Sequence, residues 1–274
     1  MNKTSPIGVF DSGVGGLSVL RALRVQSPEE SILYFADQEH VPYGSRPLEE
    51  VRQFSEAITR FLLGQEAKLI VVACNAASAA ALHSLRETFP SIPFVGMEPA
   101  VKPAAETTRT GVVGVLATPA TFQGALYASV VERFANNVTL LQNTCPGLVQ
   151  QIEQGELDAL KTRRILEMAL EPMLKQHIDT VVLGCTHYPF VIPLIQEIVG
   201  TDVRVIDPAP AIARQVQRLL ISNQQKGGAK DGERITRFFT SGEPHRFESL
   251  LTRLQIELGE VQKAVWKGIK VEAA

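Results

Sequence analysis

The chain has 274 residues, 45% of them apolar, and a formal net charge of −2 at pH 7. This length suits one large domain or two small ones with a substantial core, and the small negative charge argues against nucleic acid or an anionic membrane as the main partner. No apolar run approaches the ~20 residues of a membrane span, and the N-terminus leads straight into a strand-like segment without a signal-peptide region, so we expect a cytoplasmic protein.

Short apolar runs alternate with longer helical patterns in the first part of the chain. Strands are expected at residues 7–10, 31–37, 68–74 and 92–97, and helices from residue 17, over 47–63 and over 75–89. The strand segments are apolar on both faces and each is followed by a helix. This alternation predicts a parallel sheet covered by helices.

The same pattern then starts again. Strands are expected at residues 110–118, 137–142, 179–185 and 203–207, and helices from residue 119, over 156–176, from residue 193 and over 210–221. Residues 223–234 are polar and contain glycine, which predicts a surface loop. Residues 236–254 have the pattern of a strand, a turn and a helix, and we expect this tail to pack back on one of the domains.

The two halves of the chain resemble each other. "IVVACNAAS" matches "VVLGCTHYP", and "IGVFDSGVGG" has the same role as "TGVVGVLATP": a strand, a small polar turn and a helix. We therefore predict an α/β fold of two pseudosymmetric domains, each a mainly parallel sheet flanked by helices. Prolines and a polar stretch place the boundary near residues 97–110. The pattern indicates a divergent duplication and not a short solenoid repeat.

Two of the three cysteines, Cys74 and Cys185, lie at matching points of the two halves. The third, Cys145, has no matched partner and is interpreted as structural. An odd number of cysteines argues against a disulfide framework. The chain has no CxxC pair and its five histidines are scattered, so we predict no metal site. Free cysteine is often only a small buried hydrophobic residue, but the matched setting favours a function for this pair.

Both matched cysteines follow a strand and precede a helix. Ligands bind at the carboxyl ends of strands in open parallel sheets, and a helix N-terminus lowers the pKa of a thiol. Two domains that face each other would bring both thiols onto one cleft. A thiolate on one face could then remove a proton from a stereocentre while a thiol on the other face returns one. This arrangement suits racemisation.

A second interpretation is a thiol hydrolase in which His187 is the base for Cys185. It leaves Cys74 unexplained. A pyridoxal phosphate enzyme would need a Schiff-base lysine, and nothing about Lys68 or Lys102 suggests one. We therefore expect no cofactor.

Four motifs, "DSGVGGLSVL", "PYGSRP", "ACNAASA" and "LGCTHYP", resemble those of the glutamate racemases. These are cofactor-independent enzymes that supply D-glutamate for bacterial peptidoglycan synthesis, and hence for cell-wall biogenesis and cell shape. The resemblance runs from residue 7 to about residue 220 in matching order, and "FFTSGEPHRF" fits too. "GCTHYP" is quite specific. "DSGVGG" contains no GxGxxG, so it does not predict a dinucleotide site.

The resemblance implies a site and a domain division. The catalytic residues would be Cys74, Cys185, Asp11, His187 and Glu153, and the substrate-binding residues would be Asp11, Ser12, Pro42, Tyr43, Gly44, Asn75, Ala76, Thr186 and His187. Cys74 would deprotonate D-glutamate and Cys185 would deprotonate L-glutamate. The first domain would hold residues 1–99 and 208–274, the second residues 100–207, with the active site in the cleft between them. A homodimer is common in the family.

The chain departs from the family pattern at three positions. The family usually has a threonine where this chain has Ala76, which removes one hydroxyl that would contact a substrate carboxylate. Ala36 and Gln38 stand where the family more often has glycine and threonine. Racemisation of aspartate or another amino acid therefore stays open, as does a non-catalytic protein that binds glutamate. We interpret His40, His83, His177 and His245 as surface or packing residues.

Overall fold

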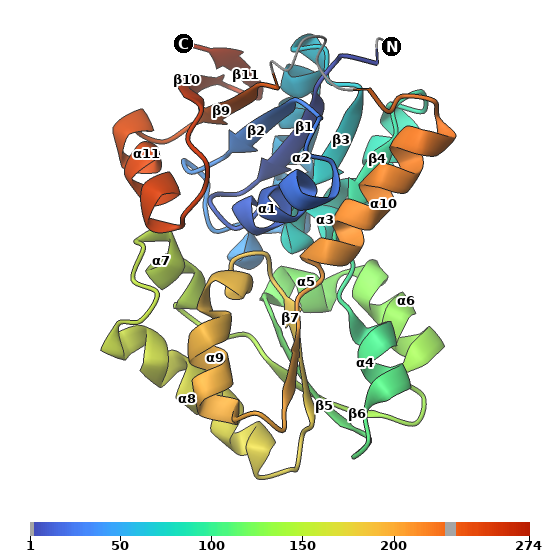
Figure 1. Cartoon of the computed structure of the whole chain (residues 1–274), viewed down its shortest axis with the longest axis vertical. Coiled ribbons are helices and arrows are strands. Elements are labelled where there is room, and N and C mark those ends of the chain that lie inside the picture. Colours follow the sequence, from blue (N-terminus) through green and yellow to red (C-terminus); the bar gives the residue numbers. More distant parts are fainter. Residues whose placement is uncertain (1–2, 228–233) are drawn as a thin grey trace.

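Two β-sheets, each covered by helices, form the upper and lower lobes of the molecule (Figure 1). The computed structural model describes residues 3–227 and 234–274. Residues 228–233, in the loop expected at 223–234, lie outside the described part. Among the described residues, no helix is long and apolar enough to cross a membrane. The expected α/β class, with two mainly parallel sheets flanked by helices, is confirmed.

In the described chain the first sheet has seven strands in the order β11-β10-β9-β2-β1-β3-β4. They are β1 (Ile7–Asp11), β2 (Ile32–Ala36), β3 (Leu69–Val72), β4 (Phe94–Gly96), β9 (Thr236–Thr240), β10 (Glu260–Lys267) and β11 (Lys270–Ala273). Neighbouring strands are parallel except β11, which is antiparallel to β10. The C-terminal segment therefore returns to the first sheet, where β9 pairs with β2.

Successive side chains of the central strands point to opposite faces of this sheet, as the period of two requires. Val9 and Phe238 pack with α1 (Leu17–Gln26), α10 (Ala209–Ser222) and α11 (Pro244–Arg253). Phe10 and Phe239 pack on the other side with α2 (Leu48–Gly64) and α3 (Asn75–Thr88). Burial of both faces explains why the strands are continuous apolar runs.

The second sheet is parallel, with the order β6-β5-β7-β8. Its strands are β5 (Val112–Ala117), β6 (Thr139–Asn143), β7 (Thr180–Gly184) and β8 (Arg204–Ile206). One face packs with α4 (Val101–Thr107) and α6 (Ala125–Phe134), the other with α7 (Leu148–Glu153), α8 (Leu160–Leu174) and α9 (Ile192–Val199). Three short helices, η1 (Tyr43–Ser45), α5 (Pro119–Gln123) and η2 (Tyr188–Val191), lie near the meeting point of the lobes.

The apolar cluster that contains Val9 also contains Leu183 and Leu166 of the second lobe, so the lobes share a continuous core. The chain crosses between them after β4 and again after β8 (Figure 1). The precise domain limits at residues 99/100 and 207/208 stay a prediction.

Several elements differ from the sequence-based expectation. Helix α4 lies inside the segment where prolines were expected to interrupt the pattern. Pro103 is compatible with the helix because it falls in the first turn, where its missing N–H needs no partner. The helix expected at 156–176 begins only at Leu160, and the separate helix α7 precedes it. Gly155, with φ 74°, occupies the turn between them. Strands β10 and β11 were not predicted, because most of their residues are at least partly exposed and the segment lacks an apolar run.

Asp179, which precedes β7, fixes the turn between α4 and β5. Its carboxylate accepts hydrogen bonds from the Thr108 hydroxyl at 2.8 Å, the Thr110 N–H at 3.0 Å, the Arg109 N–H and the Thr180 hydroxyl at 3.0 Å. Burial alone would raise the pKa of Asp179. The hydrogen bonds outweigh burial and lower the pKa to about 2.

We expect Asp179→Ala to lower the free energy of unfolding by about 2 kcal/mol at pH 7. The folded-state pKa lies below the ordinary value near 3.8, so this stability is present above about pH 4 and is lost as the pH falls toward about 2. Urea unfolding of wild type and variant at neutral pH and near pH 3 measures the difference. An equal loss of unfolding free energy at both pH values would show that the hydrogen bonds to the ionised Asp179 carboxylate are not its source.

Candidate active site

A small buried cavity lies where the strand ends of the two lobes meet. Its volume is about 20 Å³, room for about one water molecule and far below the roughly 300–1,000 Å³ typical of small-ligand pockets. The lining residues are Ser12, Pro42, Tyr43, Gly44, Cys74, Asn75, Ala76, Thr118, Val149, Cys185, Thr186 and His187. Both matched cysteines therefore border one cavity.

The structure brings the predicted residues together. All of them line the cavity except Asp11 and Glu153, which are buried directly behind its wall. Thr118 and Val149 line the cavity without having been predicted. Thr118 directly follows β5, as Ser12 directly follows β1, so the internal repeat contained a signal for it. Val149 has an apolar side chain on the unpredicted helix α7, and no motif marked it.

Cys74 ends the β3 segment and is the N-cap of α3. Its sulfur accepts a hydrogen bond from the Ala77 N–H at 3.5 Å and contacts the Ser12 hydroxyl at 4.0 Å. Only 5% of the residue is exposed. Burial, and secondly the charge of Asp11, raises the pKa of this thiol well above its ordinary value, which outweighs the helix N-terminus. Cys74 therefore rests as the neutral thiol.

Cys185 follows β7 and begins a chain of buried polar groups. Its sulfur lies 3.8 Å from His187 Nδ1, and His187 Nε2 lies 2.6 Å from Glu153 Oε1. Burial would lower the pKa of His187, but its hydrogen bonds to Cys185 and Glu153 raise the pKa well above the ordinary value of 6.5. These surroundings favour the imidazolium form of His187, which lies between the Cys185 sulfur and the Glu153 carboxylate.

Asp11 lies between the two halves of the site. Its carboxyl group accepts hydrogen bonds from the Gly13 N–H at 2.9 Å and from the Thr186 hydroxyl at 3.3 Å. Burial raises the pKa of Asp11, and the positive charge of His187 and the Gly13 N–H oppose the rise. Its charge acts on Cys74, but its hydrogen bonds go to the glycine-rich turn and to the second lobe.

The side chain of Asn75 is buried, with 3% of the residue exposed, and neither its Oδ1 nor its Nδ2 has a hydrogen-bond partner among the described residues. Unpaired polar atoms of this kind cost free energy unless a ligand or water pairs them. Asn75 borders the cavity beside the methyl group of Ala76. One acceptor and two amide hydrogens are thus available to a bound molecule.

Tyr43 is held from outside the cavity by Asp37. The Tyr43 hydroxyl donates to Asp37 at 2.5 Å, and the same carboxylate accepts from the Ser241 hydroxyl at 2.7 Å and the Trp266 indole N–H at 2.9 Å. His40 lies 2.9 Å from it. The C-terminal strands therefore support the segment that borders the cavity, and the Tyr43 hydroxyl is already engaged.

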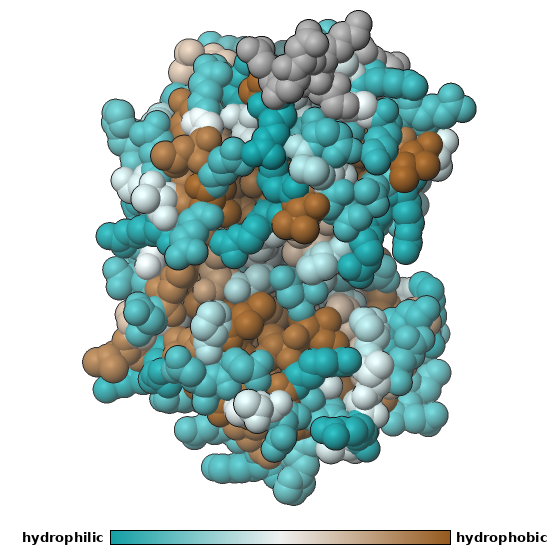
Figure 2. Space-filling view, in the orientation of Figure 1, coloured by the Kyte–Doolittle hydropathy of each residue, from teal (hydrophilic) through white to brown (hydrophobic). Residues whose placement is uncertain are grey.

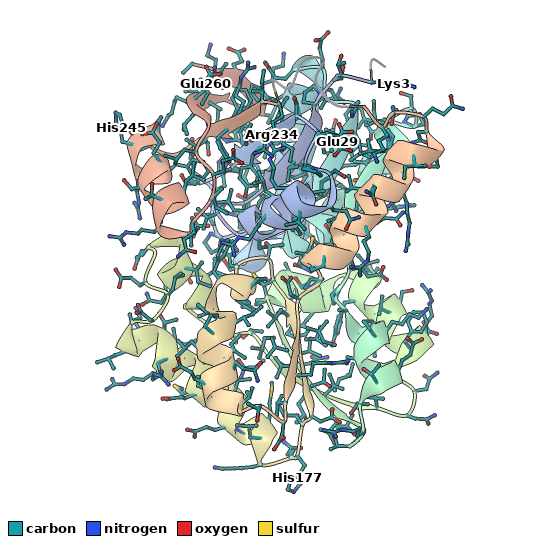
Figure 3. The ribbon with its side chains drawn as sticks, viewed as in Figure 1. Lys3, Glu29, His177, Arg234, His245 and Glu260 are labelled. Atoms are coloured by element: carbon teal, nitrogen blue, oxygen red, sulfur yellow. The ribbon has the colours of Figure 1, made fainter. Side chains whose placement is uncertain are left out.

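The remaining histidines lie away from this cavity. His177 and His245 stand at the periphery of the molecule (Figure 3), and His83 is exposed. His40 stacks on Phe54. The described residues contain no cluster of His, Cys, Asp and Glu side chains that could hold a metal ion.

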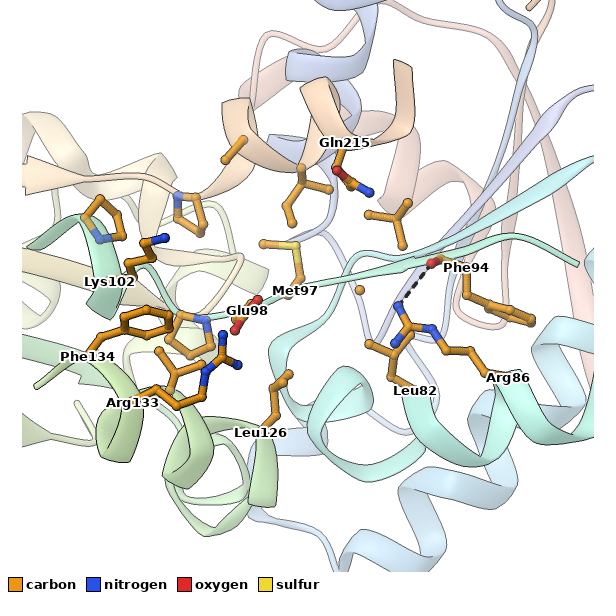
Figure 4. A pocket seen from close by; sticks show the side chains of 18 residues that line it. Leu82, Arg86, Phe94, Met97, Glu98, Lys102, Leu126, Arg133, Phe134 and Gln215 are labelled. Atoms are coloured by element: carbon orange, nitrogen blue, oxygen red, sulfur yellow. Dashed lines mark hydrogen bonds between the residues drawn. The ribbon is translucent and has the colours of Figure 1, made fainter. Parts of the chain in front are cut away.

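A larger groove lies between α3, α4, α6 and α10, where the surface is indented between the lobes (Figures 2 and 4). It is lined by Arg86, Lys102 and Arg133 together with Glu98. Arg86 donates to the carbonyl of Phe94 at 3.3 Å. Neither thiol borders this groove, so it is separate from the cavity described above.

These features define a two-lobed α/β protein in which each lobe contributes one thiol to a shared buried cavity. The family model for Asp/Glu/hydantoin racemases matches residues 12–216. The chain therefore belongs to this family and is an amino-acid racemase, as the four motifs indicated.

Curated relatives and solved structures agree. The chain is 50% identical to the glutamate racemase of Ectopseudomonas mendocina, over 95% of this chain and 99% of that protein. It superposes on a glutamate racemase isoform from Bacillus anthracis with a TM-score of 0.85, 34% identity and coverage of 98% and 100%. For the Francisella tularensis glutamate racemase in complex with D-glutamate, the TM-score is 0.82, the identity 32% and the coverage 97% and 98%.

Proposed function

We propose that this protein interconverts L- and D-glutamate without a cofactor, with Cys74 and Cys185 as its acid–base pair. The observation that carries the proposal is that the two thiols, one from the same point of each lobe, border one buried cavity. The names of the relatives, and the neighbouring structure with D-glutamate, support glutamate as the substrate.

The reaction moves protons only. A thiolate on one face takes the Cα proton, and the electron pair of the broken C–H bond stays on Cα beside the carboxylate. The thiol on the opposite face then gives its S–H proton to Cα and becomes a thiolate. The configuration is inverted, the two sulfurs have exchanged roles, and turnover in the other direction restores them. A cavity with little water strengthens the charge interactions that stabilise the carbanion.

Each sulfur has its own support. On the second-lobe side, the His187 imidazolium stabilises the Cys185 thiolate, and Glu153 orients the imidazole. On the first-lobe side, Asp11 acts on Cys74 through its charge, and Ser12 contacts the sulfur. The two halves match in fold but differ in charge.

The free amide of Asn75 fits the zwitterionic end of an amino acid. Its Oδ1 can accept from the ammonium group and its Nδ2 can donate to a carboxylate. We propose that the other substrate contacts come from Ser12, Thr186 and the segment 42–44, all on the cavity wall. Hydrogen bonds to charged groups contribute about 1.5–3 kcal/mol each, enough to orient a small ligand.

In the cell, we propose that the enzyme works in the cytoplasm and supplies D-glutamate for peptidoglycan, and hence for cell-wall biogenesis and cell shape. A homodimer is proposed from the family resemblance. The thiol hydrolase remains the second candidate because Cys185 lies 3.8 Å from His187. It is disfavoured because the chain belongs to a racemase family and because the hydrolase gives Cys74 no role.

The test is a circular-dichroism assay of the purified enzyme with L- and D-glutamate, and in parallel with both enantiomers of aspartate. The proposal expects optical activity to decay to zero from either glutamate enantiomer. Faster turnover of aspartate than of glutamate would identify aspartate, and not glutamate, as the substrate. No racemisation of either amino acid would reject the proposed function.

The methyl group of Ala76 offers a test of substrate contacts. We expect Ala76→Thr to lower KM for glutamate by about 2- to 10-fold with little change in kcat, because a hydroxyl hydrogen bond contributes about 0.5–1.5 kcal/mol. Ala80→Thr, in the same helix but off the cavity wall, controls for helix propensity. A KM that rises or stays unchanged would place the carboxylate elsewhere.

A further inference from the structure

The glycine-rich turn of residues 11–16 faces side chains of the second lobe. Val14 N–H donates to Glu153 Oε1 at 2.8 Å, and the same oxygen lies 2.6 Å from His187 Nε2. Gln38, also of the first lobe, lies 3.4 Å from the other Glu153 oxygen. The carboxylate that orients His187 is therefore held partly by the opposite lobe.

Two glycines of this turn, Gly13 and Gly15, leave space for side chains of the second lobe. A Cβ on Gly13 would lie 2.0 Å from Glu153 Oε1 and 2.7 Å from its Cδ. A Cβ on Gly15 would lie 2.4 Å from His187 Nδ1. Gly13 does not have a left-handed backbone, so its conformation alone would accept alanine. The small residue at position 13 leaves room for a carboxylate from the other lobe.

Two further hydrogen bonds join the same region of the first lobe to Thr186 of the second lobe. The Ser18 hydroxyl donates to the Thr186 carbonyl at 2.9 Å, and the Thr186 hydroxyl donates to Asp11 at 3.3 Å. Every one of these contacts joins the first lobe either to Glu153 or to Thr186, which lies between Cys185 and His187. Separation of the lobes would break them together, and water would take the place of the Val14 N–H on Glu153.

We infer that the Val14 N–H is a positioning group that fixes Glu153 for His187 only when the lobes are closed, so that acid–base chemistry at Cys185 is coupled to closure. The inference rests on the proposed function only for the role of Cys185. In an open molecule, Glu153 would keep His187 as a partner but lose its anchor, and the imidazole would lose its fixed orientation toward the sulfur.

The first test is Gly13→Ala. The added methyl group would meet Glu153 and hold the lobes apart, so we expect kcat to fall about 30-fold in a variant that still unfolds cooperatively. Alkylation of Cys74 by iodoacetamide, followed by peptide mass spectrometry, should become about 10-fold faster without substrate. Cys74 is the reporter because it is only 5% exposed and has no hydrogen bond to His187. Gly64→Ala is the matched control, since no atom of the described residues lies within 4 Å of its added Cβ.

The second test repeats the substitution without the carboxylate. Glu153→Ala alone should speed alkylation of Cys74, and adding Gly13→Ala should then change the rate less than about 2-fold. If Gly13→Ala has the same effect in both backgrounds, the methyl group acts through something other than Glu153 and the inference fails. Unchanged alkylation in Gly13→Ala would also overturn it. This readout needs no substrate, so it stands even if the wild type does not racemise glutamate.

Discussion

Replacing either Cys74 or Cys185 with alanine is expected to lower kcat for glutamate racemisation by at least about 10⁴-fold. In the proposed mechanism each turnover needs a thiolate on one face of Cα and a thiol on the other, and a positioned acid or base alone contributes about 10²- to 10⁴-fold. Loss of one sulfur removes the base in one direction and the acid in the other. Decay of the circular-dichroism signal from each pure enantiomer measures both directions.

Proton exchange with solvent separates the two sulfurs. In D₂O, Cys74→Ala still has Cys185, which can remove and return a proton on one face. It should exchange the Cα hydrogen of L-glutamate with retention of configuration, and Cys185→Ala should do the same with D-glutamate. The wild type should exchange both. Incorporation of deuterium, followed by mass spectrometry after chiral separation, gives the result.

Cys145→Ala is the matched control, because Cys145 is equally buried but borders neither the cavity nor His187. It should keep kcat within about 3-fold of wild type. Near-normal racemisation by either of the other two variants would exclude the two-thiol scheme. Harmless loss of Cys74 together with full loss of activity on removal of Cys185 would instead point to a single-thiol enzyme.

The fold and the thiol pair could be predicted because their signals are local. Strands such as β1 and β3 are buried on both faces and appear as apolar runs, and helices with one apolar face follow them. Cys74 and Cys185 end such runs, where the rule for parallel sheets places ligands. The internal repeat also relates the two positions to each other.

The chain of contacts from Cys185 through His187 to Glu153 could not be predicted from the sequence pattern itself. Glu153 looks like an ordinary helix-surface glutamate, yet it is buried and bonded to Val14 from the other lobe. Asp37 supports Tyr43 through Ser241 and Trp266, which are distant in the chain. Such contacts depend on how the lobes and the C-terminal strands pack, and no periodicity records that packing.

Replacing His187 with asparagine is expected to lower kcat by about 10²- to 10³-fold, less than loss of either thiol. Asparagine removes the positive charge 3.8 Å from Cys185 and the proton that the imidazolium can share with it. The sulfur itself remains, so some activity persists. Steady-state rates in both directions measure the loss, and a drop of less than about 3-fold would remove His187 from the mechanism.

The direction of the pH effect follows from the raised pKa of His187. Below its ordinary value of 6.5 the imidazolium is present whether or not the protein is folded, and in the folded protein it persists above that pH. Its pairing with Glu153 stabilises the fold fully below pH 6.5 and is lost as the pH rises through the folded-state pKa. In the proposed mechanism the imidazolium also supports the Cys185 thiolate. Wild-type kcat should therefore fall on the alkaline side as the imidazolium is lost, and the His187→Asn profile should lack that decline.

Glu153→Gln should move the alkaline decline to lower pH, because the hydrogen bond to the carboxylate and its negative charge both raise the pKa of His187.

The isotope effects of His187→Asn should differ between the two enantiomers of glutamate. L- and D-glutamate have equal free energies, so kcat/KM must stay equal in the two directions for any variant. In His187→Asn the slow step is proton transfer at Cys185, so the Cα-deuterium effect should grow with L-glutamate and the solvent isotope effect with D-glutamate. The opposite pattern would assign His187 to the Cys74 face, although its imidazole contacts Cys185.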